Sequence, residues 1–316
     1  MRYARYESLR DTPNVVVDGS PNDTTVLCVT HWPAIPDAAG VADDLSAQMA
    51  FRYVDAGMDG HGEATVVTNN HYDQDGLVSI YALAEPDAAL AARDLLIDVA
   101  AAGDFGTYRD RRAAHITWVL AAWAAPADGD DPFVAALDRL PHLLAHVDEY
   151  RELWEPEDAV LAASEAAVAS GSVRVEDHPD LDLAVVHVDP DVGPWAGSRF
   201  VGQRFEGVHP MAVHNATDCS GVALVHGRRY QYTDRYETWV QYVSRTRRAR
   251  VDLRPLAHRL TALDDVEWRA DAASTLAPTL GHDRMSSLSP DTFLGELRDH
   301  LAGAPVAWDP YASGLS

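Results

Sequence analysis

The chain of 316 residues contains no lysine, so all 25 of its basic residues are arginines. Without an ammonium side chain, it cannot form a Schiff base, anchor pyridoxal phosphate or supply the lysine of a phosphate-binding loop. The simplest origin of this bias is a GC-rich genome, which also fits the abundance of Ala, Asp and Arg. The missing lysine therefore excludes mechanisms without indicating a function.

Cysteine and long apolar runs are also scarce. Cys28 and Cys219 are too few for a disulfide framework and lack ligand-type neighbours at short spacing, so we expect buried free thiols. No apolar run approaches the roughly 20 residues that span a bilayer, and the N-terminus lacks the apolar stretch of a signal peptide. The sequence therefore predicts a cytoplasmic protein without a membrane partner.

Positive charge is in short supply as well, because the formal net charge is −24. A field this negative repels polyphosphate backbones, which argues against long nucleic acid as a partner. A small phosphorylated molecule drawn to a bound metal is compatible with it. The oligomeric state is left open, with a homodimer as one alternative.

The first 125 residues alternate between strand and helix patterns. Short apolar, β-branched runs predict buried strands at 15–17, 26–29 and 64–67. Helical spacing of apolar residues follows at 39–56, where the first turn is acidic, and at 76–83, 85–102 and 108–124. This order predicts an α/β domain with a parallel sheet over residues 1–125.

A Pro/Gly/Asp-rich stretch at 125–132 indicates a linker. Residues 126–171 then read as a helical connector, in which Pro141 suits the first turn of a new helix. From 172 to 316 the pattern predicts a smaller α+β domain on a largely antiparallel or mixed sheet. Its expected strands are 172–176, 182–188, 222–232 and 236–243, and its expected helices are 253–263 and 291–302.

The chemistry-bearing stretch comes directly after the third expected strand. His71, Asp73 and Asp75 alternate there, and Gly76 is expected to open a helix. Alternate residues of an extended segment point to the same side, so the three groups can converge on one point. Imidazole and carboxylate together suit Mn²⁺, Fe²⁺ or Zn²⁺ better than Ca²⁺. The location beyond a strand end in an α/β sheet also favours a ligand site.

The alternative for this stretch is a polar turn without a metal. Asp75 would then cap the following helix, and Asn69 and Asn70 would supply turn hydrogen bonds.

The pattern His-x-Asp-x-Asp-Gly after a strand resembles the first motif of the DHH phosphoesterase superfamily. The resemblance implies a two-metal, usually manganese, centre that hydrolyses phosphoanhydrides or phosphodiesters. Residues 98–106 (DVAAAGDFG) resemble the later Asp motif of that family, which makes Asp104 an implied metal ligand. A helix C-cap turn is the alternative for Asp104.

The Asp-His-His motif of that superfamily is absent downstream of His71, which is the main departure. Upstream, two expected strands end in Asp18-Gly19 and in Thr30-His31-Trp32-Pro33, and the second resembles the Asp-His-His-Pro corner with one His lost. The resemblance then implies permuted motifs, with Asp18 and His31 in the same centre. This requires the strands ending at 17, 29 and 68 to lie side by side and parallel, with His31 and His71 on the same face.

The second half resembles, more weakly, the substrate-binding domain that accompanies DHH domains. Ser244-Arg245, followed by Val251-Asp252-Leu253, is similar to its serine-arginine strand and following helix, and this implies that Arg245 holds a phosphate. The Gly-rich loop expected after that helix is missing. Three further arginines follow Arg245, and the alternative for at least two of this cluster is to balance the acidic surface. These three are Arg247, Arg248 and Arg250.

His214, Asn215 and Asn70 are further candidates for substrate contacts. A lone histidine is more often a structural group, which is the alternative for His214. The whole chain also resembles an uncharacterised bacterial family of unknown function, and that resemblance implies no activity.

Together these observations predict a metal-dependent hydrolase of a small phosphoester or phosphoanhydride, such as a nucleotide, with a metal-activated water as nucleophile. The alternative is a DHH-like ligand-binding or scaffolding module without turnover. The expected cofactor is Mn²⁺, with Mg²⁺, Fe²⁺ and Zn²⁺ as alternatives. The predicted metal ligands are His71, Asp73, Asp75, Asp104 and Asp18, and the predicted catalytic residues are Asp73, Asp75 and His31.

Overall fold

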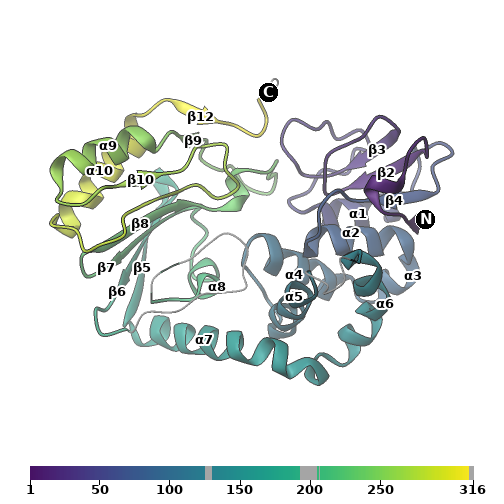
Figure 1. Cartoon of the computed structure of the whole chain (residues 1–316), viewed down its shortest axis with the longest axis horizontal. Helices are drawn as coiled ribbons and strands as arrows, with labels where there is room; N and C mark the ends of the chain where they lie inside the picture. Colours follow the sequence, from purple (N-terminus) through teal and green to yellow (C-terminus); the bar gives the residue numbers. More distant parts are fainter. Residues whose placement is uncertain (125–129, 193–204, 206, 313–316) are drawn as a thin grey trace. The chain divides into compact units, whose positions relative to one another are not determined.

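The structure, a computed structural model, describes residues 1–124, 130–192, 205 and 207–312. It is a mixed α/β protein whose chain groups into two compact units (Figure 1). In the described residues, the first unit contains Met1–Glu157 and Val240–Arg245. The second contains Asp158–Trp239 and Thr246–Ala312. No helix in these described ranges is long and apolar enough to cross a membrane.

The first unit is built on a parallel sheet, drawn in purple in Figure 1. Its strands follow the order β1 (Arg2–Tyr3), β4 (Val66–Thr68), β2 (Asn14–Val17) and β3 (Thr25–Val29). Every residue of β2 is buried, as its β-branched sequence NVVV predicts for a central parallel strand. The parallel sheet and the three strands expected from the sequence are confirmed.

The helices of this unit are α1 (Ser46–Asp55), α2 (Gln74–Ala84), α3 (Pro86–Ala91), α4 (Arg93–Asp104), α5 (Arg111–Trp123) and α6 (Pro132–Ala145). Helices α1 and α2 pack against the strands, and α4 packs on α2. A short 3₁₀ turn, η2 (Val147–Tyr150), leads into α7 (Arg151–Ser170). Helix α2 is buried from Gln74 to Leu83, as expected for a helix that is apolar on nearly all sides.

Three helix predictions need correction. The helix expected at 39–56 begins only at Ser46, because the chain before it forms an irregular loop that includes Asp43 and Asp44. The single helix expected at 85–102 is interrupted between Ala91 and Arg93. Pro141 lies inside α6 and does not begin a new helix. The linker at 125–132 falls largely on residues outside the described ranges.

The second unit contains a mixed six-stranded sheet with the order β10-β11-β8-β7-β6-β5. Only the β6–β7 pair among these described strands is parallel. The bounds are β5 (Val173–His178), β6 (Leu183–Val188), β7 (Gly221–His226), β8 (Arg229–Asp234), β10 (Arg269–Ala270) and β11 (Thr279–Gly281). The other elements are the 3₁₀ turn η3 (Pro179–Leu181), α8 (Pro210–His214), α9 (Arg254–Leu263), α10 (Pro290–Gly303), and the antiparallel pair β9 (Arg250–Val251) and β12 (Val306–Trp308).

Two strand predictions differ from this topology. The run at 222–232 is a hairpin of β7 and β8, in which Gly227 turns the chain with a φ of 60° that favours glycine. The strand expected at 236–243 is instead the 3₁₀ turn η4 (Tyr236–Thr238) followed by an irregular segment.

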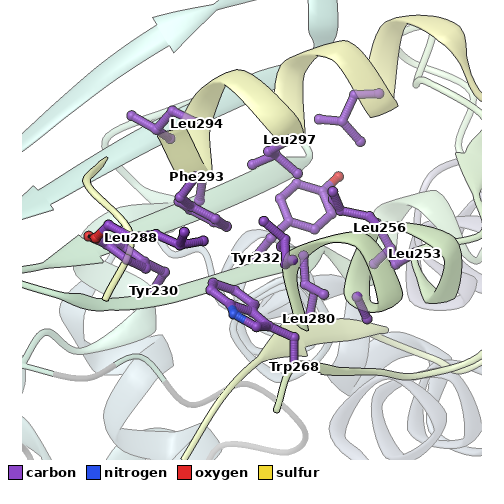
Figure 2. Packing of buried hydrophobic residues seen from close by; sticks show 14 of the residues in the cluster. Tyr230, Tyr232, Leu253, Leu256, Trp268, Leu280, Leu288, Phe293, Leu294 and Leu297 are labelled. Carbon is purple, nitrogen blue, oxygen red and sulfur yellow. Dashed lines mark hydrogen bonds between the residues drawn. The ribbon is translucent and has the colours of Figure 1, made fainter. Parts of the chain in front are cut away.

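The core of the second unit lies between its sheet and helices α9 and α10 (Figure 2). Tyr230 of β8 stacks on Phe293 of α10 with ring centroids 4.8 Å apart. Trp268 also stacks on Phe293, at 5.4 Å. Leu256 of α9 and Leu297 of α10 are fully buried in the same cluster.

Candidate metal centre

Three neighbouring strands of the first unit end at the candidate site. Strand β2 is followed by Asp18, β3 by Thr30 and His31, and β4 by the segment from Asn69 to Asp73. Because β4, β2 and β3 are parallel neighbours, their C-terminal ends share one edge of the sheet. The strand arrangement predicted from the sequence is therefore confirmed.

The first ligand group surrounds the His31 imidazole. Its Nε2 lies 3.4 Å from Asp18 Oδ1, 3.6 Å from Asp104 Oδ2 and 3.7 Å from Asp75 Oδ2. The side chains of Asp18, His31 and Asp75 are at most 1% exposed, and that of Asp104 is 7% exposed. Asp18, His31 and Asp75 have the mutual spacing of a metal-binding group.

The second ligand group lies beside the first and is more open. His71 Nε2 is 2.7 Å from Asp73 Oδ2 and 3.6 Å from Asp18 Oδ2. The side chains of His71 and Asp73 are 33% and 24% exposed. Asp18 thus belongs to both groups, with Oδ1 toward His31 and Oδ2 toward His71.

Hydrogen bonds fix the orientation of the buried ligands. His31 Nδ1 is 2.7 Å from the carbonyl oxygen of Asp44, to which it can only donate, so in the neutral imidazole Nε2 is the nitrogen that could bind a metal. Asp75 accepts the backbone N–H groups of Ser46 (2.8 Å) and Ala47 (2.7 Å) at the start of α1. The positive end of the α1 dipole favours a carboxylate there. Ser46 Oγ also donates to Asp18 Oδ1 at 2.8 Å.

Two asparagines tie the loop after β4 to the end of β2. Asn69 Nδ2 donates to the carbonyl oxygen of Asp18 (3.0 Å), and Asn69 Oδ1 accepts the backbone N–H of His71 (2.8 Å). Asn70 Oδ1 accepts the backbone N–H of Ser20 (3.0 Å). Asn70 was predicted to bind substrate, and in the structure its side-chain oxygen supports the backbone next to Asp18.

The sequence predicted that His71, Asp73 and Asp75 alternate along one extended segment and converge on one point, and the structure differs from this prediction. These residues do not lie on one extended segment, because α2 begins at Gln74 and Asp75 occupies its first turn. Their side chains consequently divide between the two groups and do not converge on one point. Asp73, not Asp75, caps α2, because Asp73 Oδ1 accepts the N–H of Gly76 at 2.8 Å.

The electrostatics of the cluster favour a cation. Burial acts to lower the pKa of His31, but the Asp18 and Asp75 carboxylates outweigh it and raise that pKa to about 8. Burial likewise acts against the charged form of His71, yet Asp73 and Asp18 raise its pKa to about 9. Burial and the repulsion from Asp18 raise the pKa of Asp75 to about 8. Raised pKa values for both imidazoles indicate a strongly negative potential at the site.

The donor set fits divalent ions. Oxygen and imidazole nitrogen atoms meet in two adjacent groups, and the shared Asp18 offers one carboxylate oxygen to each. Asp18 is 1% exposed, and its Oδ2 has no hydrogen-bond partner within the described part of the chain. A buried carboxylate oxygen without such a partner is costly unless a cation neutralises it.

The remaining predicted substrate residues divide between the two units. Arg245 is exposed at the end of Val240–Arg245, which belongs to the first unit. His214 and Asn215, at the end of α8, belong to the second unit, and His214 is buried beside Phe205. Of the arginines after Arg245, Arg248 pairs with Asp234 at 2.7 Å and Arg250 is fully buried.

Sequence reasoning missed the residues that hold the ligands in place. Asp44 and Ser46 were interpreted as part of a helix from 39 to 56, and neither was singled out as a contact of the site. In the structure both are buried, and both contact ligands that are remote in sequence. The only local signal is the polar composition of the segment before α1, which does not distinguish a buried loop from an exposed helix start.

Comparison with known proteins adds a family but no activity. A family described as "Family of unknown function (DUF6687)" matches residues 1–312. The chain matches no curated protein and no solved structure.

Proposed function

The chain belongs to the DUF6687 family, which implies no activity, and we propose that it is a divalent-metal-dependent phosphoesterase acting on a small phosphorylated molecule. The observation that carries this proposal is the Asp18 carboxylate, which is shared by two adjacent His/Asp groups. A carboxylate that offers one oxygen to each group could help to hold two ions close together, as the two-metal centres of phosphate ester hydrolysis require.

The two groups suggest different roles for their residues. Asp18, His31, Asp75 and Asp104 are nearly inaccessible, so they would hold a cation away from bulk water. His71 and Asp73 are partly exposed, so their group is the one a substrate can reach. Bound ions would lower the pKa of a coordinated water, making it a nucleophile, and neutralise charge on the phosphoryl group.

The chain's own residues would complete the site around the substrate. The hydrogen bond from His31 to the Asp44 carbonyl and the bonds from Ser46 and Ala47 to Asp75 hold these ligands before any ion binds. Arg245 would bind the phosphate, since a guanidinium can donate two parallel hydrogen bonds to it. Mn²⁺ suits the mixed nitrogen and oxygen donors, with Mg²⁺, Fe²⁺ and Zn²⁺ as alternatives.

The resemblance to DHH phosphoesterases supports the same proposal. If the motifs of that superfamily occur here in permuted order, four residues must gather at one edge of the sheet: Asp18, His31, His71 and Asp104. The distances around His31 and Asp18 agree with that requirement. We therefore propose that the first unit is a DHH-like domain with rearranged motif order.

A binding module without turnover is the second candidate. The burial of the His31 group favours it, because structural metal sites are closed whereas catalytic sites keep an open position. The partly exposed His71 group is the reason to prefer the enzyme.

The first test is the metal content of protein purified without chelator. The wild type should retain Mn, Fe, Zn or Mg, and Asp18→Asn should lose all of it because both groups depend on Asp18. His71→Gln should lose only the more exposed ion. Asp87→Asn, an exposed acidic position in α3, controls for the loss of one negative charge. A wild type that retains no metal and is not stabilised by Mn²⁺ would contradict the proposal.

The second test separates the enzyme from the binding module. A panel of nucleotides and generic phosphodiesters with Mn²⁺ should show turnover that EDTA abolishes, and Arg245→Ala should raise KM for the hydrolysed compound. Mn²⁺-dependent binding of a compound without hydrolysis of any of the panel would favour the module.

A further inference from the structure

One short segment of the second half of the chain is docked on the metal centre. This return segment, Val240–Arg245, belongs to the first unit although the residues before and after it belong to the second. The backbone N–H of Gln241 donates to the carbonyl oxygen of His31 at 2.7 Å. The N–H groups of Val243 and Ser244 both donate to Asp44 Oδ1, each at 2.8 Å.

Asp44 therefore makes two kinds of contact at once. Its carboxylate holds the return segment, while its carbonyl oxygen accepts the Nδ1 proton of His31. Asp44 is 9% exposed; its bond with His31 is buried, and its bonds with Val243 and Ser244 are partly buried. Phe105 also makes ring contacts with both His31 and the return segment. Its ring centroid is 6.4 Å from that of His31 and 5.6 Å from that of Tyr242.

We propose that Asp44 is a positioning residue that couples docking of the return segment to metal binding at His31. The inference rests on the proposed function, because it assumes that His31 is a metal ligand. A ligating imidazole binds best when its other nitrogen is held by a hydrogen bond, and losing such a partner typically weakens metal binding about 10- to 100-fold. The position of the Asp44 carbonyl group depends in turn on the two hydrogen bonds that the Asp44 carboxylate accepts from the Val243 and Ser244 amides.

Coupling of this kind is reciprocal. If docking of the return segment favours the metal, the metal must favour docking by the same factor. Because the segment is bounded on both sides by residues of the second unit, a change in that unit can reach His31 through the backbone of residues 240–245.

The test measures hydrogen exchange of peptides covering residues 240–245, with and without Mn²⁺, together with the Mn²⁺ affinity. In the wild type, Mn²⁺ should slow exchange of the Gln241, Val243 and Ser244 amides by about tenfold, a typical size for coupling between sites. In Asp44→Ala these amides should exchange rapidly with or without Mn²⁺, and the Kd for Mn²⁺ should rise about tenfold or more.

Asp37→Ala is the matched control. Asp37 lies in the same loop, and its carboxylate also accepts two backbone N–H groups, those of Val41 and Ala42, at 3.0 and 2.9 Å. This variant should loosen the loop but keep both the Mn²⁺ affinity and the Mn²⁺-dependent protection of the return segment. Asp44→Asn, which keeps one acceptor oxygen, should give an intermediate result and serves if Asp44→Ala fails to fold.

The outcomes distinguish this inference from the proposed function. Unchanged Mn²⁺ affinity and unchanged Mn²⁺-dependent protection in both Asp44 variants would overturn the coupling while leaving the metal centre intact. Mn²⁺ binding with the expected protection but no hydrolysis of any substrate would overturn the proposed enzyme and leave the coupling standing. A wild type that binds no Mn²⁺ would overturn both.

Discussion

Arg250 shows how one charged residue can organise the interior of the second unit. Its side chain is fully buried and donates to Thr238 Oγ1 (2.6 Å) and to the carbonyl oxygens of Ala273 (2.9 Å) and Leu276 (2.8 Å), among others. Burial lowers its pKa to about 10, so the guanidinium remains charged at neutral pH. Charge-assisted bonds to several carbonyls therefore offset the cost of burying the cation.

Replacing Arg250 with methionine should destabilise the protein strongly. Methionine fills a similar volume but leaves several buried acceptors without a donor, and each one costs about 1–3 kcal/mol. We expect a loss of at least about 3 kcal/mol in the free energy of unfolding, measured by urea denaturation. Arg259→Met on the exposed side of α9 is the control and should have a much smaller effect. Equal losses in the two variants would show that the buried carbonyls do not depend on Arg250.

Asp264, which follows α9, should make stability depend on acid pH. Partial burial acts to raise its pKa, but hydrogen bonds from Ser286, Trp268 and Ser287 outweigh it and hold the pKa well below the usual range. A carboxyl group whose pKa is lowered by folding stabilises the protein above its unfolded pKa of roughly 3.9, and this contribution is lost as pH falls through the folded value.

Asp264→Asn isolates this contribution. The difference in unfolding free energy between the wild type and this variant should be constant from pH 7 to about 5 and should shrink below about pH 4. The neighbouring exposed Asp265→Asn controls for the loss of one charge. A difference that stays constant down to pH 3 would show that the carboxylate form of Asp264 is not what the hydrogen bonds stabilise.

The arginines near the return segment mark the limit of residue-level prediction. Arg245, Arg248 and Arg250 lie within six positions of sequence and look alike there. In the structure the first is exposed, the second pairs with Asp234, and the third is buried among carbonyls. The environment of each arginine is set by strands and turns that are remote in sequence. The sequence could therefore indicate that some of these arginines are structural, but not which ones.

At the scale of elements, strands were easier to predict than loops. The β-branched runs at β2 and β3 are determined locally, and the rule that parallel strands end at one edge then predicted that Asp18, His31 and the residues after β4 would meet. The loop before α1 has no such local determinant. Asp44 is buried there because it binds His31 and the return segment, and neither contact can be read from the residues around it.

Gly76, in the first turn of α2, should be as necessary to the site as the predicted ligands. A Cβ at Gly76 would lie 2.2 Å from Asn69 Nδ2 and 3.1 Å from Asp73 Oδ1. Gly76→Ala should therefore displace Asn69, which holds Asp18 and the N–H of His71. We expect at least about a tenfold rise in the Kd for Mn²⁺, measured by calorimetry, although no ligand is removed.

Gly295→Ala in α10 is the control for this substitution. Nothing lies within 4 Å of a Cβ at Gly295, so alanine there should stabilise the helix by up to about 1 kcal/mol and leave Mn²⁺ binding unchanged. If Gly76→Ala binds Mn²⁺ as the wild type does, the Asn69 contacts are not needed to hold the ligands.

At the scale of the whole molecule, the net charge of −24 and the proposed metal centre should act on stability in different ways. The excess negative charge opposes the compact state through long-range repulsion, which salt screens over a Debye length of roughly 8–10 Å at physiological ionic strength. The proposed metal centre, by contrast, concentrates carboxylates of the first unit within a few ångströms and should respond to specific ions. The two contributions can be separated by varying salt and Mn²⁺ independently.

Chelated protein should melt at a higher temperature when NaCl is raised from about 0.02 to 0.2 M, because screening relieves the repulsion. At constant NaCl, Mn²⁺ at about a hundred times its Kd should add roughly 2.7 kcal/mol for each bound ion, a shift of about 5 °C. With the total ionic strength held constant, this second shift reports binding. Asp18→Asn should keep the response to NaCl and lose the response to Mn²⁺. If it kept both, Mn²⁺ would be acting on the general acidic surface, and the cluster around Asp18 would not be the site of the stabilising ion.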